Sequence, residues 1–593
     1  MSSGRLSVAG VAAEVGAGRR STESVAADTL ARVAAYEAVQ PAVWIERVSA
    51  DEVLSAARAI DRRVAAGHSL ALAGVPFAVK DNIDIAGLAT TAACPAFAYR
   101  PVATAPVVQR LLDAGALLVG KTNLDQFATG LVGTRSPYGT CASVYNRDYI
   151  SGGSSAGSAV AVAAGLVAFA LGTDTAGSGR VPAALNHLVG LKPTRGRWST
   201  RGVVPACRSL DCVTVFASTV EDAARVDDVV TGFDEHDIFS RLGPAAPAPR
   251  SPGFRLGIPR SEQLEWFGDG QSPRLFEAAV ERLVAAGGQP VEIDLDPLLV
   301  AAELLYQGPW VAERTAAVEA LLRDKPLAIH PVVRGILQGG LTWSAVDAFN
   351  AQYRMLAYQR DAQRLWSDVD VLLTPTCGAT WRVREVLAEP LALNANLGRY
   401  TNFVNLLDMS AVAVPAGFRD NATAFGVTLI GPAWADRILI DVARRYEETA
   451  PMPDTPPLDL AGVKPTVKLA VVGAHLGGMP LHWQLTSREA ALVRRCKTAE
   501  AYRLYAMANS TPPKPALVHV GEGGAAIEVE VYELAMEAFG SFVAEVPPPL
   551  AIGTVTLDDG VSVKGFVAEP RALDGAEDIT ALGGWRAYIS SLN

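Results

Sequence analysis

Two Gly/Ser-rich turns and one lysine are the residues of this sequence that could form a catalytic site together. The turns lie around Ser154 and Ser178, on either side of an apolar stretch of small residues. A serine hydroxyl becomes a nucleophile when a base removes its proton. None of the seven histidines lies in a hydrolase triad motif, and the pattern GxSxG is absent around both turns. The sequence therefore requires a base of another kind.

Lys80 could be that base. It ends the apolar run GVPFAVK, which predicts a short buried strand, and Asp81 and Asn82 follow it. A lysine acts as a base only when it is neutral, so its pKa must fall by several units from about 10.4, and burial provides such a shift. We expect an enclosed, dry site around Lys80. The alternative is an ordinary lysine that points from the strand end into solvent.

Together these motifs resemble the amidase signature family of Ser-cisSer-Lys amide hydrolases. The resemblance rests on GVPFAVKDN and on GGSSAGSAVAVAAGLVAFALGTDTAGSGRVPAA, in which twenty-four positions separate Ser154 from Ser178, as in the family. It implies that Lys80 is the general base, that Ser154 follows a cis peptide bond and relays the proton, and that Ser178 is the nucleophile. It also implies an oxyanion hole formed by the backbone amides of Thr175, Ala176, Gly177 and Ser178.

The loop before Ser178 departs from the family at one position, because Ala176 stands where glycine is common. Alanine keeps its N–H group, so the oxyanion hole survives if Ala176 can adopt the required backbone angles. Asp174 and Arg180 are expected to brace this loop. A structural salt bridge and a substrate contact are both open for them.

Further segments resemble the allophanate hydrolases of this family, namely 93–99, 121–139, 306–314 and 471–485. In that group a tyrosine and an arginine eight positions apart bind the substrate carboxylate, which selects Tyr306 and Arg314, and Gly130 is expected to offer a backbone contact. The planar guanidinium of arginine matches a carboxylate well. The alternative is that 306–314 is an amphipathic helix with a solvated Arg314 and a core Tyr306.

The resemblance implies hydrolysis of allophanate to ammonia and N-carboxycarbamate, which then loses carbon dioxide with help from the C-terminal domain. His475 is preferred over His482 as the acid–base group of that domain, and structural roles for both remain open. One alternative is an amidase for another small carboxylated amide. Another is the glutamine amidase subunit of a tRNA transamidation complex, and a third is an inactive amidase fold that serves as a scaffold.

Alternating helical and strand patterns predict an α/β fold, and the resemblance implies a mixed central sheet covered by helices. We expect an amidase domain over 1–450, a proline-rich linker over 451–465 and a smaller α+β domain over 466–593. The last domain resembles the gamma-glutamyl cyclotransferase-like fold, with 502–507 as its first strand.

Composition limits the possible partners of the chain. The formal net charge of −10 over 593 residues argues against a nucleic-acid-binding surface, and no apolar run is long enough to cross a membrane. Scattered cysteines and an N-terminus without a signal-peptide core predict a cytoplasmic protein. Metal and dinucleotide motifs are absent, so we expect no cofactor. The resemblance implies a homodimer that acts on a small anionic amide, in association with other enzymes of urea or biuret breakdown.

Overall fold

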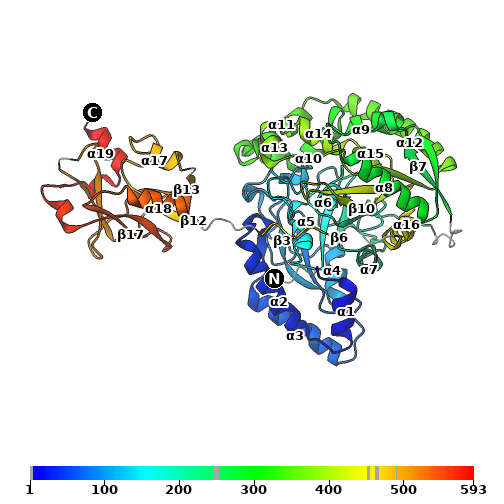
Figure 1. Ribbon diagram of the computed structural model, residues 1–593, viewed down its shortest axis with the longest axis horizontal. Helices are drawn as coiled ribbons and strands as arrows, with labels where there is room; N and C mark the ends of the chain where they lie inside the picture. Colours follow the sequence, from blue (N-terminus) through cyan, green and yellow to red (C-terminus); the bar gives the residue numbers. More distant parts are fainter. Residues whose placement is uncertain are drawn as a thin grey trace. The chain divides into compact units, whose positions relative to one another are not determined.

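The computed structural model describes residues 5–244, 253–449, 455–460, 466–488, 490–508 and 510–592. The chain divides into two compact units, Met1–Leu460 and Ala461–Asn593 (Figure 1). Most of the proline-rich segment 451–465 lies outside the described residues, and its described part, 455–460, contains neither helix nor strand.

A mixed sheet of eleven described strands forms the centre of the first unit. Parallel pairing joins β2 to β3 and β4, and β7 to β8 and β9, while the other neighbours are antiparallel. In order across the sheet the strands are β1 (Trp44–Arg47), β3 (Leu117–Thr122), β2 (Pro76–Lys80), β4 (Phe169–Asp174), β6 (Cys212–Ala217), β5 (Val189–Lys192), β10 (Ser410–Phe418), β11 (Ala424–Gly431), β9 (Val371–Pro375), β7 (Phe254–Pro259) and β8 (Gly288–Ile293).

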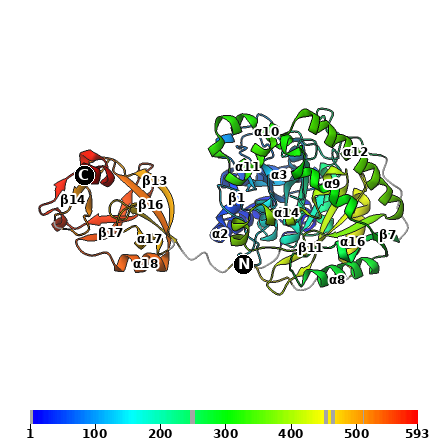
Figure 2. The same ribbon diagram turned by 90° about the horizontal axis from the view of Figure 1, so that it is seen from above.

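Helices cover both faces of this sheet (Figures 1 and 2). Side chains alternate along a strand, so Phe77 and Val79 of β2 join one hydrophobic cluster while Ala78 joins another. The first cluster includes residues of α1 (Val8–Gly16), α4 (Pro106–Asp113), α7 (Val220–Val230), α8 (Ser272–Ala285) and α16 (Asp436–Glu448). The second includes residues of α2 (Thr22–Glu37) and α5 (Ala156–Ala163).

The first unit contains further helices besides these. The capping box predicted at Ser49 is present and starts the amphipathic helix α3. These helices are α3 (Ala50–Ala65), α6 (Val181–Leu185), α9 (Asp296–Gln307), α10 (Trp310–Asp324), α11 (Pro331–Gly340), α12 (Ala345–Asp368), α13 (Val383–Ala388), α14 (Ala392–Gly398) and α15 (Asn402–Leu406).

Small residues allow α5 to lie unusually close to the chain beneath it. A Cβ atom added to Gly157 would lie 2.4 Å from the carbonyl oxygen of Val43 and 2.6 Å from the backbone nitrogen of Asn123. All eight residues of α5 are buried. Because Ser154 and Ser155 lie just before this helix, its close packing fixes the position of the first serine-rich turn.

The second unit contains a five-stranded and a three-stranded sheet in its described residues. The prediction that 502–507 is its first strand is wrong, because two strands precede β14. The strands are β12 (Thr466–Val471), β13 (Ala491–Lys497), β14 (Tyr502–Ala506), β15 (Pro515–His519), β16 (Glu528–Ala535), β17 (Leu550–Thr556), β18 (Ser562–Ala568) and β19 (Glu577–Asp578). The helices are α17 (Trp483–Thr486), α18 (Met536–Ala544) and α19 (Trp585–Ser591).

Helix lengths and cysteine pairing bear on the predictions made from composition. Within the described ranges, none of the helices has the length and apolar character needed to cross a membrane. All six cysteines are free, and Cys496 is the one that is not fully buried.

Candidate active site

Lys80 ends strand β2 and is completely buried. Its Nζ atom lies 2.7 Å from Ser154 Oγ and 2.7 Å from Thr173 Oγ1. Burial lowers the pKa of Lys80 from 10.5 to about 7, although Asp125, Asp211 and Asp174 act in the opposite direction. The alternative of a solvent-exposed strand-end lysine is therefore wrong.

A second buried lysine, Lys121 of the adjacent strand β3, has a different partner. Its Nζ atom lies 3.1 Å from a carboxylate oxygen of Asp81, and both side chains are fully buried. The two hydrogen-bond partners of Lys80 are hydroxyl groups and carry no charge. Burial lowers the pKa of both lysines, and at Lys121 the Asp81 carboxylate opposes this shift because an ion pair favours the charged form.

The turn around Ser154 is held by Asp125. The peptide bond between Gly153 and Ser154 is cis. The amide of Asp125 donates to the carbonyl of Ser154 at 3.0 Å, and the Asp125 carboxylate accepts from the amides of Val132, Gly133 and Arg135 at 2.9–3.1 Å. Asp125 thus joins the turn of Ser154, through its backbone amide, to the loop that contains Gly130, through its carboxylate.

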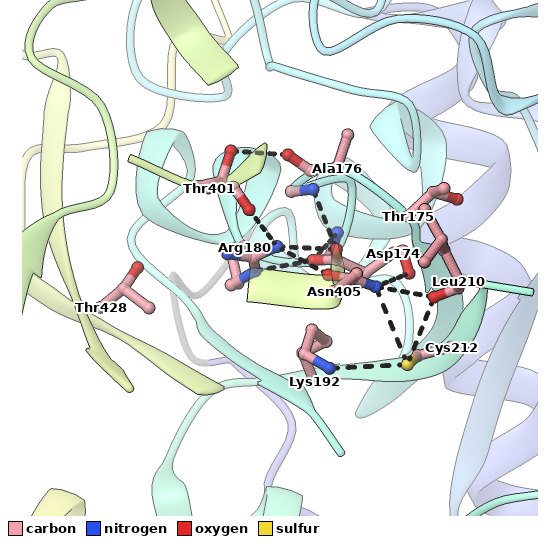
Figure 3. A network of polar contacts seen from close by, with 12 residues as sticks. Asp174, Thr175, Ala176, Arg180, Lys192, Leu210, Cys212, Thr401, Asn405 and Thr428 are labelled. Carbon is pink, nitrogen blue, oxygen red and sulfur yellow. Dashed lines mark hydrogen bonds and ion pairs between the residues drawn. The ribbon is translucent and has the colours of Figure 1, made fainter. Parts of the chain in front are cut away.

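The second serine-rich turn is braced by a buried ion pair (Figure 3). The Arg180 guanidinium donates two hydrogen bonds of 2.9 Å to the Asp174 carboxylate, and both side chains are fully buried. Arg180 also donates to the carbonyl of Thr401 at 3.1 Å and to Asn405 Oδ1 at 3.2 Å. Of the two roles considered for Asp174 and Arg180, the structural salt bridge is the one observed.

The backbone amides of this turn have different partners. Gly177 donates its amide to Asp174 Oδ1 at 2.9 Å. Thr175, Ala176 and Ser178 have no acceptor for their amides among the described residues. The φ angle of Ala176 is not positive, so alanine adopts this backbone without left-handed angles. Three of the four amides considered for an oxyanion hole are therefore available.

Gly177 is required at its position by both conformation and space. Its φ is +127°, and an added Cβ atom would lie 2.4 Å from Thr401 Oγ1. The Thr401 hydroxyl in turn donates to the carbonyl of Ala176 at 2.6 Å. The turn that carries Ser178, itself 2% exposed, is thus fixed from the side of α15.

Tyr306 and Arg314 lie on two helices, because the chain breaks at Gly308 and Pro309 between α9 and α10. Arg314 is 2% exposed, and its carbon Cζ lies 5.2 Å from the centroid of the Tyr306 ring. Its Nη2 lies 3.5 Å from Tyr306 Oη. The alternative of one amphipathic helix with a solvated arginine is therefore wrong.

The loop before Arg135 connects this pair to the serine turns. Arg314 Nη1 donates to Thr129 Oγ1 at 3.4 Å, and Arg314 Nε is a buried donor without a partner among the described residues. Gly130 follows Thr129 with a φ of +155°, and a Cβ atom there would lie 2.7 Å from Asp125 Oδ2. Glycine is therefore needed where the backbone passes between the Asp125 carboxylate and the Arg135 side chain.

A cavity of about 600 Å³ opens beside Tyr306. Its lining includes Asn394, Arg399 and Asn402, but not Lys80 or the two serines. The cavity therefore borders Tyr306, and Arg314 is not part of its lining.

The second unit contains the two candidate histidines. His475 Nε2 lies 2.7 Å from Gln484 Oε1, and His482 Nε2 lies 3.0 Å from Tyr532 Oη. Burial lowers the pKa of His475. The described residues contain no group of three or more His, Cys, Asp or Glu side chains with the arrangement of a metal site.

Several contacts of the site were not identified from the sequence. Thr173 lies inside the motif GTDTAGS but gives no sign there that it contacts Lys80. Thr401 and Asn405 are more than two hundred positions from Ser178, in a segment without a recognisable pattern. Asp211, whose carboxylate accepts from the Thr175 hydroxyl, is likewise brought in by the fold.

Comparisons with known proteins agree with this organisation. The family model described as Amidase matches residues 28–440, and that described as Allophanate hydrolase C-terminal domain matches residues 467–590. Urea amidolyase of Saccharomyces cerevisiae is 46% identical over 574 residues, which cover 93% of this chain and 31% of that protein. The chain thus spans about a third of the length of this curated relative.

Two further relatives differ in how much of the chain they match. A glutamyl-tRNA(Gln) amidotransferase subunit of Symbiobacterium thermophilum is 36% identical over 471 residues, covering 73% of this chain and 94% of that protein. The solved structure of allophanate hydrolase from Kluyveromyces lactis is 42% identical, with a TM-score of 0.67, and covers 96% of this chain and 99% of that one. These matches confirm the predicted amidase signature fold followed by a smaller C-terminal domain. The chain therefore belongs to the amidase family, and its C-terminal part matches the allophanate hydrolase C-terminal domain.

Proposed function

We propose that this chain hydrolyses allophanate to ammonia and N-carboxycarbamate, and that its C-terminal unit then promotes loss of carbon dioxide. The observation that carries the proposal is the buried Lys80, whose Nζ is 2.7 Å from Ser154 Oγ. The match to an allophanate hydrolase over nearly the full length of both chains supports the choice of substrate. The domains that we assign to the two steps are 1–450 and 466–593, joined by 451–465.

The first step begins with transfer of a proton through two serines. A neutral lysine has one lone pair, which accepts the Ser154 proton, while an Nζ–H bond donates to Thr173 Oγ1. Ser154 then takes the proton of Ser178, and Ser178 Oγ attacks the amide carbonyl. A pKa of about 7 allows Lys80 to accept a proton near neutral pH and to return it to the leaving ammonia.

The oxyanion that forms on this attack needs hydrogen-bond donors already in place. We assign this role to the amides of Thr175, Ala176 and Ser178, since Gly177 uses its amide on Asp174. Each such donor contributes about 3–4 kcal/mol to transition-state stabilisation in enzymes with comparable sites. Water then hydrolyses the acyl-enzyme, so that allophanate and water give ammonia and N-carboxycarbamate.

The substrate carboxylate is bound by Arg314 and Tyr306 in this proposal. A buried guanidinium costs free energy unless a partner balances its charge. Arg314 has Thr129 and Tyr306 as neutral partners and an unpartnered Nε, so a bound carboxylate would supply the missing acceptor. Gly130 would contribute a backbone contact, because its lack of a side chain leaves the loop free to approach the substrate.

The second step is assigned to the C-terminal unit, with His475 as its acid–base group. N-carboxycarbamate in its acid form loses carbon dioxide when its C–N bond breaks, and the resulting carbamate gives ammonia and a second carbon dioxide. We further propose that the protein acts as a cytoplasmic homodimer, in association with other enzymes of urea or biuret breakdown.

The experiment that tests the proposal measures ammonia release from allophanate by the purified chain, with malonamate and glutamine as control substrates. Two ammonia per allophanate are expected, with no release by Ser178→Ala. Arg314→Lys should retain the nucleophile but lose affinity for allophanate. Turnover of glutamine or a neutral amide without turnover of allophanate would refute the substrate assignment and leave the amidase chemistry intact.

A further inference from the structure

His475 occupies an enclosed position in the second unit. Its ring stacks on Phe566 with centroids 5.0 Å apart and meets Phe542 edge-on at 5.1 Å. Phe542 comes from α18 and Phe566 from β18, so the histidine is held between two elements. This packing fixes the plane of the imidazole ring and leaves its hydrogen bonds to decide which nitrogen carries the proton.

Those hydrogen bonds define the tautomer of His475. Arg488 donates to Glu545 Oε1 at 2.6 Å, and Gln484 Nε2 donates to Glu545 Oε2 at 3.2 Å. The amide nitrogen of Gln484 is thereby committed to the carboxylate, so its oxygen Oε1 must face the histidine. Because Oε1 can only accept, His475 Nε2 donates across their 2.7 Å contact. In neutral His475 the lone pair is therefore on Nδ1.

His475 Nδ1 is left without a hydrogen bond. It has no partner among the described residues, and the His475 side chain is half-buried. The charged and titratable groups that act on the ring besides Gln484 and its partner are Lys514 and His482, and both favour its neutral form. A neutral imidazole with one open lone pair is the arrangement needed for proton transfer.

We propose that Gln484 and Glu545 are positioning residues that hold His475 with its lone pair on Nδ1, so that this atom shuttles the proton of the second step. This inference rests on the proposed function. In the acid form of N-carboxycarbamate, Nδ1 takes the carboxyl proton as the C–N bond breaks. The O–H electrons form the second C=O bond of carbon dioxide, the C–N electrons remain on nitrogen, and Nδ1 returns the proton there. Carbamate and carbon dioxide result without any co-reactant.

The other histidine of the same segment provides a matched control. Tyr532 donates its hydroxyl to Glu530 at 3.0 Å, so His482 Nε2 must donate to Tyr532 Oη in their 3.0 Å contact. Glu530 is fully buried and also accepts from Arg495 at 2.9 Å and Arg586 at 2.8 Å. The hydrogen bonds of Glu530 connect β13, β16 and α19, which indicates a structural role for this group.

The test uses the full chain and 13C-labelled allophanate, with carbon NMR to follow both the substrate and N-carboxycarbamate. Gln484→Leu should leave allophanate consumption unchanged and slow the loss of the intermediate about tenfold, as expected when an acid–base group loses its orientation. Gln484→Glu keeps an acceptor for His475 Nε2 but loses the donor to Glu545, so it should recover part of the rate. Since a carboxylate partner raises the pKa of His475, Gln484→Glu should also move the acid limb of the second step to higher pH. Tyr532→Phe should change neither rate.

Other outcomes contradict the inference. A normal second step in Gln484→Leu, equal slowing by Tyr532→Phe, or a Gln484→Glu variant with an unshifted pH profile would each overturn it. If the variants gave these results while the wild type consumed allophanate, the first step would stand. Failure of the wild type to consume allophanate at all would refute the proposed function itself. Thermal unfolding of each variant identifies any loss that comes from misfolding.

Discussion

Replacing Lys80 by methionine should abolish hydrolysis and make the pH dependence of stability less steep. The pKa of Lys80 is about 7 in the folded chain against 10.5 for a free lysine. Each pKa unit corresponds to about 1.4 kcal/mol, so the buried ammonium destabilises the folded state by about 5 kcal/mol when it is fully charged. The substitution to methionine removes this cost, together with the hydrogen bonds to Ser154 and Thr173, which contribute about 1 kcal/mol each.

The sign of the effect follows from proton binding. Between pH 7 and 10.5 the unfolded chain holds the Lys80 proton and the folded chain releases it. Stability rises with pH wherever the unfolded state binds more protons, so this lysine makes the wild-type chain more stable as pH increases through that range. Lys80→Met lacks this contribution. From pH 7 to pH 9 the wild type should therefore gain about 2 kcal/mol relative to the variant.

Urea unfolding at the two pH values measures this difference. Lys325→Met is the matched control, because Lys325 is an exposed lysine of the same unit, and its substitution should give the same stability difference at both pH values. If the difference between wild type and Lys80→Met stays constant from pH 7 to pH 9, then Lys80 is charged in the folded chain and cannot serve as the base. A Ser-Ser-Lys catalytic site would then be excluded.

Three further substitutions test the other parts of the site. Arg314→Lys should raise KM for allophanate about 10- to 100-fold with a smaller change in kcat, because lysine cannot form the paired contacts of a guanidinium, and steady-state kinetics would show this. Asp174→Asn leaves Arg180 as an unpaired buried charge, so the free energy of unfolding should fall by about 3–5 kcal/mol in urea titrations. Gly177→Ala places a Cβ atom 2.4 Å from Thr401 Oγ1, which should displace the neighbouring amides of Ala176 and Ser178. We expect kcat to fall at least about 100-fold, as on loss of an oxyanion donor, with the fold retained by circular dichroism.

The local parts of this site could be predicted from the sequence. The apolar run before Lys80 predicts a short buried strand, and β2 is that strand. Ser49 and Glu52 predict a helix start that the structure contains. In each case the relevant interactions lie within a few positions of one another, so composition and spacing carry the information.

The contacts between distant segments could not be predicted in this way. Thr401 and Asn405 reach the Ser178 turn only because α15 packs beside it, and no local pattern encodes that approach. The commitment of the Gly177 amide to Asp174 also depends on the folded turn. Similarly, Tyr306 and Arg314 suggest one helix by their spacing, although Gly308 is required where a Cβ atom would lie 2.4 Å from the Leu304 carbonyl.

Two of the three fully buried lysines among the described residues, Lys80 and Lys121, show how the fold separates the proposed base from a structural cation. Lys80 and Lys121 lie on adjacent strands and are both fully buried, so burial alone does not distinguish them. Lys121 has the Asp81 carboxylate at 3.1 Å, whereas Lys80 has two hydroxyl groups. The Asp174 carboxylate, one of three that raise the pKa of Lys80, is bonded to Arg180 and to amides of its own turn. The same ion pair thus shapes the Ser178 turn and offsets part of the charge that favours a proton on Lys80.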